Sequence, residues 1–341
     1  MWDGKKVVVT GGASFIGSHL VEALTKEGAE VWVIDDLSSG VLSNLPLAVT
    51  DKRTVIRDIH NYGSYLPLLF QGTAVVFHLA ADHGGRGYVA TQQVATSRNL
   101  ALDSIVFKAC YKASVGKVVY ASSGCVYPNY LQGDTLKTVH LSEDMVGPPY
   151  NADNLYGWAK LMGELTLKAY YEAFGMKSAI CRYFTVYGPR GKEDHAIMAM
   201  IARARAGMDP FTIWGDGNQI RNWTYVDDIV SGTLLAAEVI EDASAVNLGV
   251  MQAIRVCDAV EQVIFSFPGY RPLRKYMPDM PTGPVNRVAD NRLAYNLLGW
   301  APKWTFEDGL ARTIEWYKRA KTPDQARRIL DAGGLFARKV A

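Results

Sequence analysis

Val7-Val8-Val9-Thr10-Gly11-Gly12-Ala13-Ser14-Phe15-Ile16-Gly17 is the stretch that decides the fold. An apolar, β-branched run leads directly into glycines and then into a helical pattern over 18–27. Glycines suit such a strand-to-helix turn, because they allow a tight bend, a close approach of backbone to a pyrophosphate, and close packing of helix on strand. The stretch predicts a phosphate-binding turn whose contacts are Gly11, Ser14, Phe15, Ile16 and Gly17, the alternative being a glycine turn without a ligand.

Acidic residues follow the next two predicted strands. The run from Glu30 to Ile34 ends at Asp35, eighteen residues after Gly17, where a carboxylate binds the ribose hydroxyls of adenosine. A carboxylate there repels a 2′-phosphate, so NAD is favoured over NADP. Asp58 and Ile59 follow a strand at 54–57 and are expected to flank the adenine, although Asp58 suits a helix cap equally well.

Short buried strands alternate with helices through the first half of the chain. Further strands are predicted at 74–79, 117–122 and 178–183, with helices at 92–114 and 154–174. This alternation is typical of a parallel sheet with crossover helices. We therefore predict an α/β fold with a Rossmann-type, doubly wound parallel sheet of about seven strands.

The pattern becomes irregular after residue 185. We expect a helix at 195–206, a Pro-rich surface loop at 267–284 and a closing helix at 304–318. The predicted division is an NAD-binding domain to which some later segments return, a smaller α/β substrate lobe, and a C-terminal extension, over residues 1–185, 186–320 and 321–341.

Composition narrows the class of protein. The chain of 341 residues is 49% hydrophobic and 21% charged with a net charge of +2, which is ordinary for a globular protein and does not favour a nucleic-acid partner. No apolar run approaches the roughly 18 residues that span a membrane. Four cysteines without a C-x-x-C pair and six histidines without zinc-ligand spacing predict a cytoplasmic protein that holds no metal.

A reacting centre is indicated by two short motifs. Tyr156 and Lys160 lie four residues apart on one helical face, where an ammonium group lowers the pKa of a phenol and makes it a proton acceptor. Ser123 lies where the strand at 117–122 ends, and ligands of open α/β sheets bind at the carboxyl ends of the strands. Ser123 is therefore expected to donate a hydrogen bond to a substrate oxygen.

Taken together and in this order, these motifs resemble the extended short-chain dehydrogenase/reductase family of nucleotide-sugar epimerases and dehydratases, over about residues 5–318. Other matching stretches are Phe77-His78-Leu79-Ala80-Ala81, Arg182-Tyr183-Phe184-Thr185-Val186-Tyr187-Gly188-Pro189, Trp214-Gly215-Asp216-Gly217, Tyr225-Val226-Asp227-Asp228 and Arg287-Val288-Ala289-Asp290.

The resemblance implies a role for each motif. NAD would contact Leu79, Ala80, Ala81 and Asn99, and a GDP- or UDP-linked sugar would lie across the C-terminal lobe. Tyr156 would act as base on a sugar hydroxyl that Ser123 also binds, while Lys160 would hold the nicotinamide ribose. Arg221 and Arg287 would clamp the diphosphate. A homodimer would form through the helices at 92–114 and 154–174.

Cys125, two residues after Ser123, is similar to the position of a catalytic thiol in the plant-type GDP-mannose 3,5-epimerases. There a thiolate removes a proton next to a transient C4 ketone. The glycine-rich loop with Gly84, Gly85 and Arg86 also resembles that subgroup, as does Trp214 before Gly-Asp-Gly. Three alternatives remain: a UDP-sugar 4-epimerase in which Cys125 only packs, a dehydratase, and a non-catalytic NAD(H)-binding module. The dehydratase is disfavoured because the dehydratases of the family carry Asp-Glu where this chain has Gly124-Cys125.

Two departures from the subgroup concern the sugar. The second acid is expected in the shortened loop after Pro189, where Lys192 is the candidate and His195 the rival. Thr185 stands where the family commonly has Asn, which leaves the substrate contact at Thr185 open. Arg86 and His83 add positive charge near the predicted sugar site, so an anionic sugar such as a uronate is a further alternative.

Overall fold

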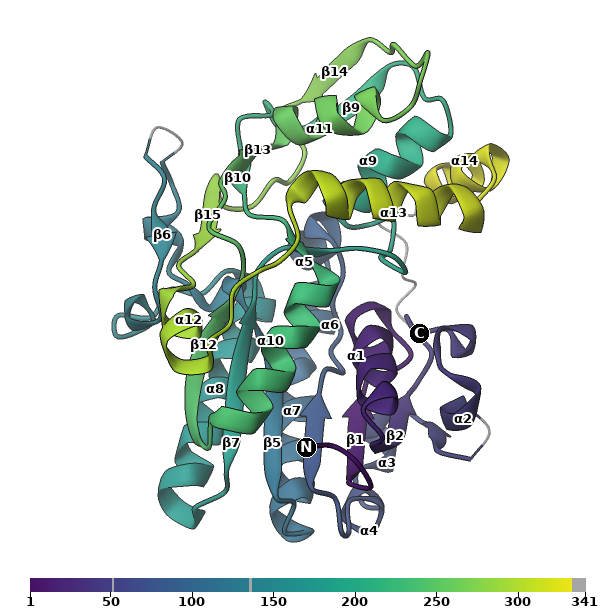
Figure 1. Ribbon diagram of the computed structural model, residues 1–341. Coiled ribbons are helices and arrows are strands. Elements are labelled where there is room, and N and C mark those ends of the chain that lie inside the picture. The colour runs from purple at the N-terminus through teal and green to yellow at the C-terminus, as the bar shows by residue number, and fades with distance from the viewer. Residues whose placement is uncertain (51, 135–136, 333–341) are drawn as a thin grey trace.

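A seven-stranded parallel sheet forms the centre of the protein (Figure 1). The computed structural model describes residues 1–50, 52–134 and 137–332. The strand order is β12-β7-β5-β4-β1-β2-β3. The chain adds β2 and β3 on one side of β1, and then adds β4 and the later strands on the other side, so the order of the strands reverses between β1 and β4. The strands are β1 (Lys6–Thr10), β2 (Glu30–Asp35), β3 (Thr54–Ile56), β4 (Val75–His78), β5 (Lys117–Ser123), β7 (Ser178–Tyr183) and β12 (Asp242–Leu248). This is the doubly wound order, and the predicted fold class is confirmed.

Helices bury both faces of the sheet. Val7 and Val9 face the core shared with α1 (Phe15–Lys26) and α10 (Val226–Val239), whereas Val8 faces the opposite core. That second core is shared with α3 (Ile59–Tyr62), α4 (Leu66–Leu69), α7 (Asn99–Lys112) and α8 (Asn154–Phe174). Burial on both sides explains why the strands read as continuous apolar runs rather than alternating ones.

A smaller lobe lies beyond the carboxyl ends of the strands, at the top of Figure 1. It contains a four-stranded sheet, β13-β10-β15-β6, and the parallel pair β14-β9. Its elements are β6 (His140–Leu141), β9 (Phe211–Trp214), β10 (Ile220–Arg221), β13 (Ile254–Arg255), β14 (Arg274–Met277), β15 (Asn286–Ala289), α9 (Ala196–Arg205) and α11 (Val256–Phe265).

The remaining elements are short connections or lie near the C-terminus. They are η1 (Leu42–Asn44), α2 (Leu47–Thr50), α5 (Arg86–Thr91), α6 (Gln93–Ser97), η2 (Gly124–Val126), η3 (Asn129–Leu131), η4 (Glu143–Met145), the pair β8 (Val186–Tyr187) and β11 (Thr224–Tyr225), α12 (Arg292–Leu298), α13 (Phe306–Ala320) and α14 (Pro323–Asp331). Within the described ranges, no helix is both long and apolar enough to cross a membrane.

The sequence-based boundaries differ from the structure in three places. The predicted helix at 92–114 is two helices, α6 and α7, with Arg98 between them. The predicted loop at 267–284 contains strand β14. The seventh strand, β12, was not located in the sequence and returns to the sheet from beyond residue 185. In the predicted extension, α14 begins with a capping box at Thr322, and residues 333–341 lie outside the described residues.

Candidate active site

A cavity of about 500 Å³ runs along the carboxyl ends of the strands and into the smaller lobe. Most of the predicted site residues line it, although they come from distant parts of the chain. They are Gly11, Ser14, Phe15, Ile16, Gly17, Asp35, Asp58, Ile59, Leu79, Ala80, Ala81, Gly84, Gly85, Arg86, Ser123, Cys125, Tyr156, Lys160, Thr185, Trp214, Arg221 and Arg287. Asn99 and Lys192 are not among its lining residues.

The glycine turn is sterically fixed. A Cβ atom at Gly17 would lie 2.1 Å from the carbonyl oxygen of Gly11, so α1 approaches β1 more closely than any other residue allows. Gly11 has φ +70°, and a Cβ there would lie 2.8 Å from the nitrogen of Ala80. The Ser14 hydroxyl lies 3.1 Å from that of Ser39. The turn therefore has the close-packed geometry that a dinucleotide pyrophosphate requires.

Asp35 and Asp58 line the cavity where β2 and β3 end. Asp35 is buried and accepts hydrogen bonds from the N–H groups of Ala13 (2.9 Å) and Leu37 (2.8 Å). Burial raises the pKa of Asp35, and these two bonds only partly oppose that shift. Asp58 caps α3 by accepting from the N–H of His60, and it also lines the cavity. The two interpretations of Asp58 are thus compatible.

Asn99 is buried behind the lining of the cavity. Its side chain is fully buried, accepts from the N–H of Asp82 (2.7 Å) and donates to the carbonyl of Asp82 (2.9 Å). Asn99 therefore holds the glycine-rich loop that follows β4. Its predicted contact with NAD stays a prediction.

Tyr156 and Lys160 project from α8 toward Ser123 at the end of β5. Tyr156 hydrogen-bonds Ser123, and Lys160 Nζ lies 6.0 Å from the Tyr156 ring. Burial raises the pKa of Tyr156, and the charge of Cys125 adds to this, whereas the bond to Ser123 opposes it. The lowered pKa expected from Lys160 is therefore not found, because loss of water around the phenol outweighs the neighbouring cation.

A buried polar chain beneath Lys160 was not anticipated from the sequence. Thr10 Oγ1 lies 2.7 Å from His78 Nδ1, and His78 Nε2 lies 3.0 Å from Asp103, which also accepts from Tyr120. Lys160 Nζ lies 4.6 Å from the centre of the Tyr120 ring. Burial lowers the pKa of Lys160, and the charge of Asp103 opposes this. These hydrogen-bonded residues therefore form the buried surface against which the Lys160 side chain packs.

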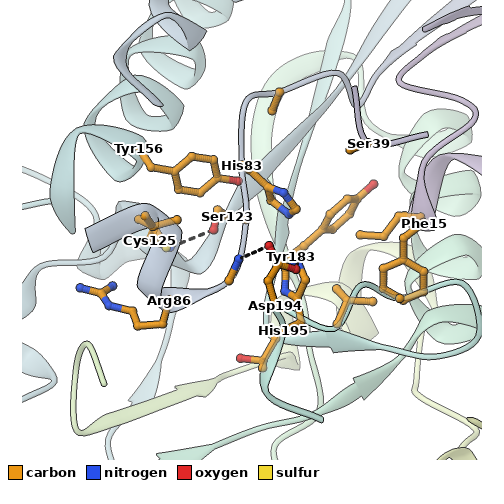
Figure 2. Close-up of a pocket in the computed structure, with 18 of the residues that line it drawn as sticks. Phe15, Ser39, His83, Arg86, Ser123, Cys125, Tyr156, Tyr183, Asp194 and His195 are labelled. Atoms are coloured by element: carbon orange, nitrogen blue, oxygen red, sulfur yellow. Dashed lines mark hydrogen bonds and ion pairs between the residues drawn. The ribbon is translucent and has the colours of Figure 1, made fainter. Parts of the chain in front are cut away.

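Cys125 lies beside Tyr156 because α8 packs directly on the turn η2. A Cβ at Gly157 would lie 2.3 Å from the carbonyl oxygen of Cys125. Figure 2 shows Tyr156, Ser123 and Cys125 close together in the pocket. Cys125 is half-buried, lines the cavity and accepts a hydrogen bond on Sγ from Arg287 Nη1 over 3.1 Å.

Arg287 thus faces the thiol rather than open space. Its Nη2 donates to Asp153 (3.0 Å), and its Nε donates to Gln132 (2.7 Å). Asp153 also accepts from Arg86 over 2.7 Å. Burial alone would raise the pKa of Asp153, but the charges of Arg287 and Arg86 outweigh it and hold that pKa low. Neither Asp153 nor Gln132 stands in a motif, so only the structure reveals them.

Arg221 completes a positively charged region. It donates to the carbonyls of Ile220 (2.7 Å) and Thr282 (2.8 Å). Burial, with the neighbouring charges of Arg287 and Arg86, lowers its pKa to about 9. Arg86 and Arg287 both pair with Asp153, whereas Arg221 bonds only carbonyl oxygens, and such a region favours an anionic ligand.

The loop after Tyr187 places His195, not Lys192, near His83 and Tyr156. The ring of His195 lies 5.2 Å from that of His83, which in turn lies 6.0 Å from the Tyr156 ring (Figure 2). The loop is held by Asp194, which accepts from the N–H of Gly85 over 3.1 Å. Lys192 instead adds a small lowering effect on the pKa of Asp35, which places its charge toward Asp35.

The sheet and the glycine turn define an α/β protein with a dinucleotide-binding fold, and the buried Tyr156–Lys160 pair lies beside the turn. The chain matches the model of the NAD dependent epimerase/dehydratase family over residues 7–249. The chain therefore belongs to this family, and NAD is its cofactor. The close-packed turn at Gly11 and Gly17, Asp35 at the end of β2 and the buried Lys160 fit that cofactor.

Relatives of this chain act on several nucleotide sugars. It is 29% identical to GDP-mannose 3,5-epimerase 1 of Oryza sativa subsp. japonica, over 99% of this chain and 89% of the relative. UDP-glucuronic acid 4-epimerase from Bacillus cereus, solved with UDP-glucuronic acid and NAD, is 30% identical with a TM-score of 0.81, over 93% of this chain and 100% of that one. UDP-glucose 4-epimerase from Thermotoga maritima, solved with UDP-glucose, is 28% identical with a TM-score of 0.81, over 92% and 99%.

Proposed function

We propose that the protein is a nucleotide-sugar epimerase that inverts a hexose at C3 or C5 after transient oxidation at C4, as GDP-mannose 3,5-epimerases do. The observation that carries this proposal is the contact between Arg287 and Cys125, beside Tyr156. A thiol that only fills space does not need a guanidinium donor. When bound, NAD supplies the reversible hydride transfer at C4.

Tyr156 is the proposed acid and base at the C4 oxygen. In its phenolate form it accepts the hydroxyl proton as C4 becomes a ketone, and it returns that proton when C4 is reduced again. Ser123, bonded to Tyr156, holds the same oxygen. Lys160 lies in the same buried wall of the cavity and would bind the nicotinamide ribose.

Cys125 is the proposed base at carbon. A ketone at C4 makes the protons at C3 and C5 labile, and the Cys125 thiolate removes one of them. Arg287 stabilises negative charge on Sγ through its hydrogen bond. His195 is the proposed acid that returns a proton from the other side of the sugar, because it lines the cavity beside His83, whereas Lys192 does not line it. Each cycle moves one proton out and one proton in, and leaves the redox state unchanged.

A second candidate is a 4-epimerase acting on a UDP-linked uronate. The excess of positive charge from Arg86, Arg221 and Arg287 favours it, and so does the buried Nε of Arg86, which has no hydrogen-bond partner within the described chain. A sugar carboxylate would meet this charge. In that reaction C4 alone is inverted, and Cys125 has no proton to remove.

The protein is also proposed to form a homodimer through α7 and α8. These helices pack against each other and leave apolar side chains in solvent, among them Leu100, Leu155, Trp158 and Met162. Single exposed apolar residues are ordinary, but a row along one helix suggests an interface. The four cysteines are unpaired, as is typical of reducing compartments, and we place the protein in the cytoplasm.

The deciding experiment is solvent deuterium exchange. The NAD-loaded enzyme is incubated in deuterated buffer with GDP-mannose, UDP-glucose or UDP-glucuronate, and proton NMR locates any exchange. Deuterium at C3 or C5 of the hexose is the expected result. Inversion at C4 without deuterium uptake would replace this proposal with the 4-epimerase.

A further inference from the structure

Arg203, on α9, is a buried cation that the site described so far does not use. Its residue is only 7% exposed, and it lines the part of the cavity that extends into the smaller lobe. Across residues 1–50, 52–134 and 137–332, its guanidinium has no hydrogen bond and no ion pair. Other buried arginines differ: Arg182 is paired with Glu164 at 2.7 Å, and Arg287 with Asp153 at 3.0 Å.

Burying a guanidinium group without a partner lowers the stability of the folded protein. Burial lowers the pKa of Arg203 to about 10, and only the Tyr270 hydroxyl opposes this. That hydroxyl is itself directed to the carbonyl of Met208. The Arg203 nitrogens keep a little exposed surface but find no acceptor among the described residues, and a cation that loses most of its water in this way destabilises a fold. Its presence is explained if a ligand supplies the acceptors.

The position of Arg203 in the cavity indicates which part of a ligand it meets. The glycine turn and Asp35 take the NAD end, and Tyr156 with Cys125 takes the sugar. The guanidinium group of Arg221 suits the diphosphate. What remains of a nucleotide sugar is its base, and the lobe offers largely apolar walls for a flat ring, from Met200, Ile213, Trp214, Val256 and Val260.

We propose that Arg203 reads the nucleotide base and selects guanine. A guanidinium donates two parallel hydrogen bonds to O6 and N7 of guanine, whereas the corresponding edge of uracil offers a single carbonyl. Gln219, which also lines the cavity, adds a further polar group. This inference deepens the proposed function, since it names the base of the substrate, but it concerns binding and not turnover.

The test is calorimetric titration of the NAD-loaded protein with sugar-free nucleoside diphosphates. The wild-type protein is expected to bind GDP and IDP about 10- to 100-fold more tightly than UDP, because both purines carry O6 and N7. 7-Deaza-GDP, which lacks the N7 acceptor, should lose about tenfold. Arg203→Met should remove the GDP preference and leave UDP binding within about twofold. Arg203→Lys keeps the positive charge but lacks the two parallel N–H donors, so it should retain only part of the preference for GDP.

Arg205→Met is the matched control, since this arginine of the same helix bonds the carbonyls of Lys318 and Lys321 on the outer side. It should keep the GDP preference. Met fits the apolar surroundings of Arg203, so the variant should fold, and its melting temperature checks this. Equal binding of GDP and UDP by the wild type, or equal weakening of GDP, UDP and pyrophosphate in Arg203→Met, would overturn the inference. Guanine selectivity without C3 or C5 exchange would instead reject only the proposed reaction.

Discussion

Arg287 Nη1 donates a hydrogen bond to Cys125 Sγ over 3.1 Å, across 162 residues of sequence. Arg287 comes from β15 of the smaller lobe, and Cys125 from the turn that ends β5 of the large sheet. The two lobes thus meet at the group proposed to do the chemistry. The contact places a cation at the sulfur, and Asp153 and Gln132 hold the other guanidinium nitrogens.

Replacing Asp153 with Asn should therefore weaken Cys125 as a base without removing it. Arg287 loses its charged anchor, and a charge-assisted bond is roughly twice as strong as a neutral one. We expect the rate of C3 or C5 deuterium exchange to fall by about 10- to 100-fold. The rate at which iodoacetamide alkylates Cys125 at neutral pH should fall in parallel, which merely reduced stability would not cause.

Asp258→Asn is the matched control for that experiment. Asp258 is an exposed carboxylate that pairs with Arg255 on the surface. Its loss should leave alkylation and exchange unchanged. Unchanged alkylation of Cys125 in Asp153→Asn would mean that Arg287 does not need Asp153.

Cys125→Ser separates the two candidate reactions. A serine hydroxyl is far less acidic than a thiol, so exchange at C3 and C5 should fall at least 100-fold, the ordinary contribution of a general base. Reduction of bound NAD, followed by its absorbance, should persist because Tyr156 and Ser123 are unchanged. Cys257→Ser, in α11, should behave as wild type. A variant that keeps its full epimerase activity would show that Cys125 only packs.

Gly17→Ala should destabilise the NAD site. The added methyl group would lie 2.1 Å from the Gly11 carbonyl, so α1 must move away from β1. Small-to-large changes in packed positions typically cost about 1–3 kcal/mol. Thermal unfolding and NAD titration check this, and both should be impaired. Gly133→Ala has open space around it and should change neither. Normal NAD affinity in Gly17→Ala would mean that the turn does not hold the cofactor.

Trp158→Glu tests the proposed homodimer. Trp158 is 39% exposed on α8, in the row of apolar residues described above. A carboxylate in the middle of an apolar interface is costly to desolvate, so light scattering should show a monomer. Phe265→Glu is the control, since Phe265 is 82% exposed at the end of α11 in the smaller lobe. A wild-type monomer, or a dimer that survives Trp158→Glu, would contradict the proposal.

Much of the nucleotide end of the site was predictable, because it depends on local rules. The turn at Gly11 and Gly17, the acid at the end of β2 and the pair Tyr156 and Lys160 each have a fixed spacing in one element. The charges around Cys125 were not predictable in the same way. Arg287, Asp153 and Gln132 come from three separate segments, and the sequence suggested a diphosphate contact for Arg287. In the sequence, Arg203 is one more basic residue near the end of a helix. Only the structure, which buries it against the cavity without a partner, indicates that it contacts a ligand.

The buried chain beneath Lys160 predicts how stability depends on pH. Thr10 Oγ1 accepts from the N–H of Ala80, so its own hydrogen is free for His78 Nδ1, and the other nitrogen of His78 donates to Asp103. This hydrogen-bond pattern fits a neutral His78 in the fold. Burial lowers its pKa from 6.5, although Asp103 opposes the shift. Below about pH 6.5 the unfolded chain binds a proton that the folded chain does not, so stability falls as pH falls.

The free energy of unfolding, measured in urea between pH 7.5 and pH 5.5, should fall by up to about 1.4 kcal/mol per pH unit from this residue. His78→Asn should be less stable at pH 7.5 but show a shallower slope, because the titrating group is gone. His60→Asn, at the surface turn α3, should keep the wild-type slope. Equal slopes in His78→Asn and wild type would mean that His78 binds its proton equally in the folded and unfolded chain. A wild-type stability that rises relative to His78→Asn as pH falls would mean that His78 is protonated in the fold and forms an ion pair with Asp103.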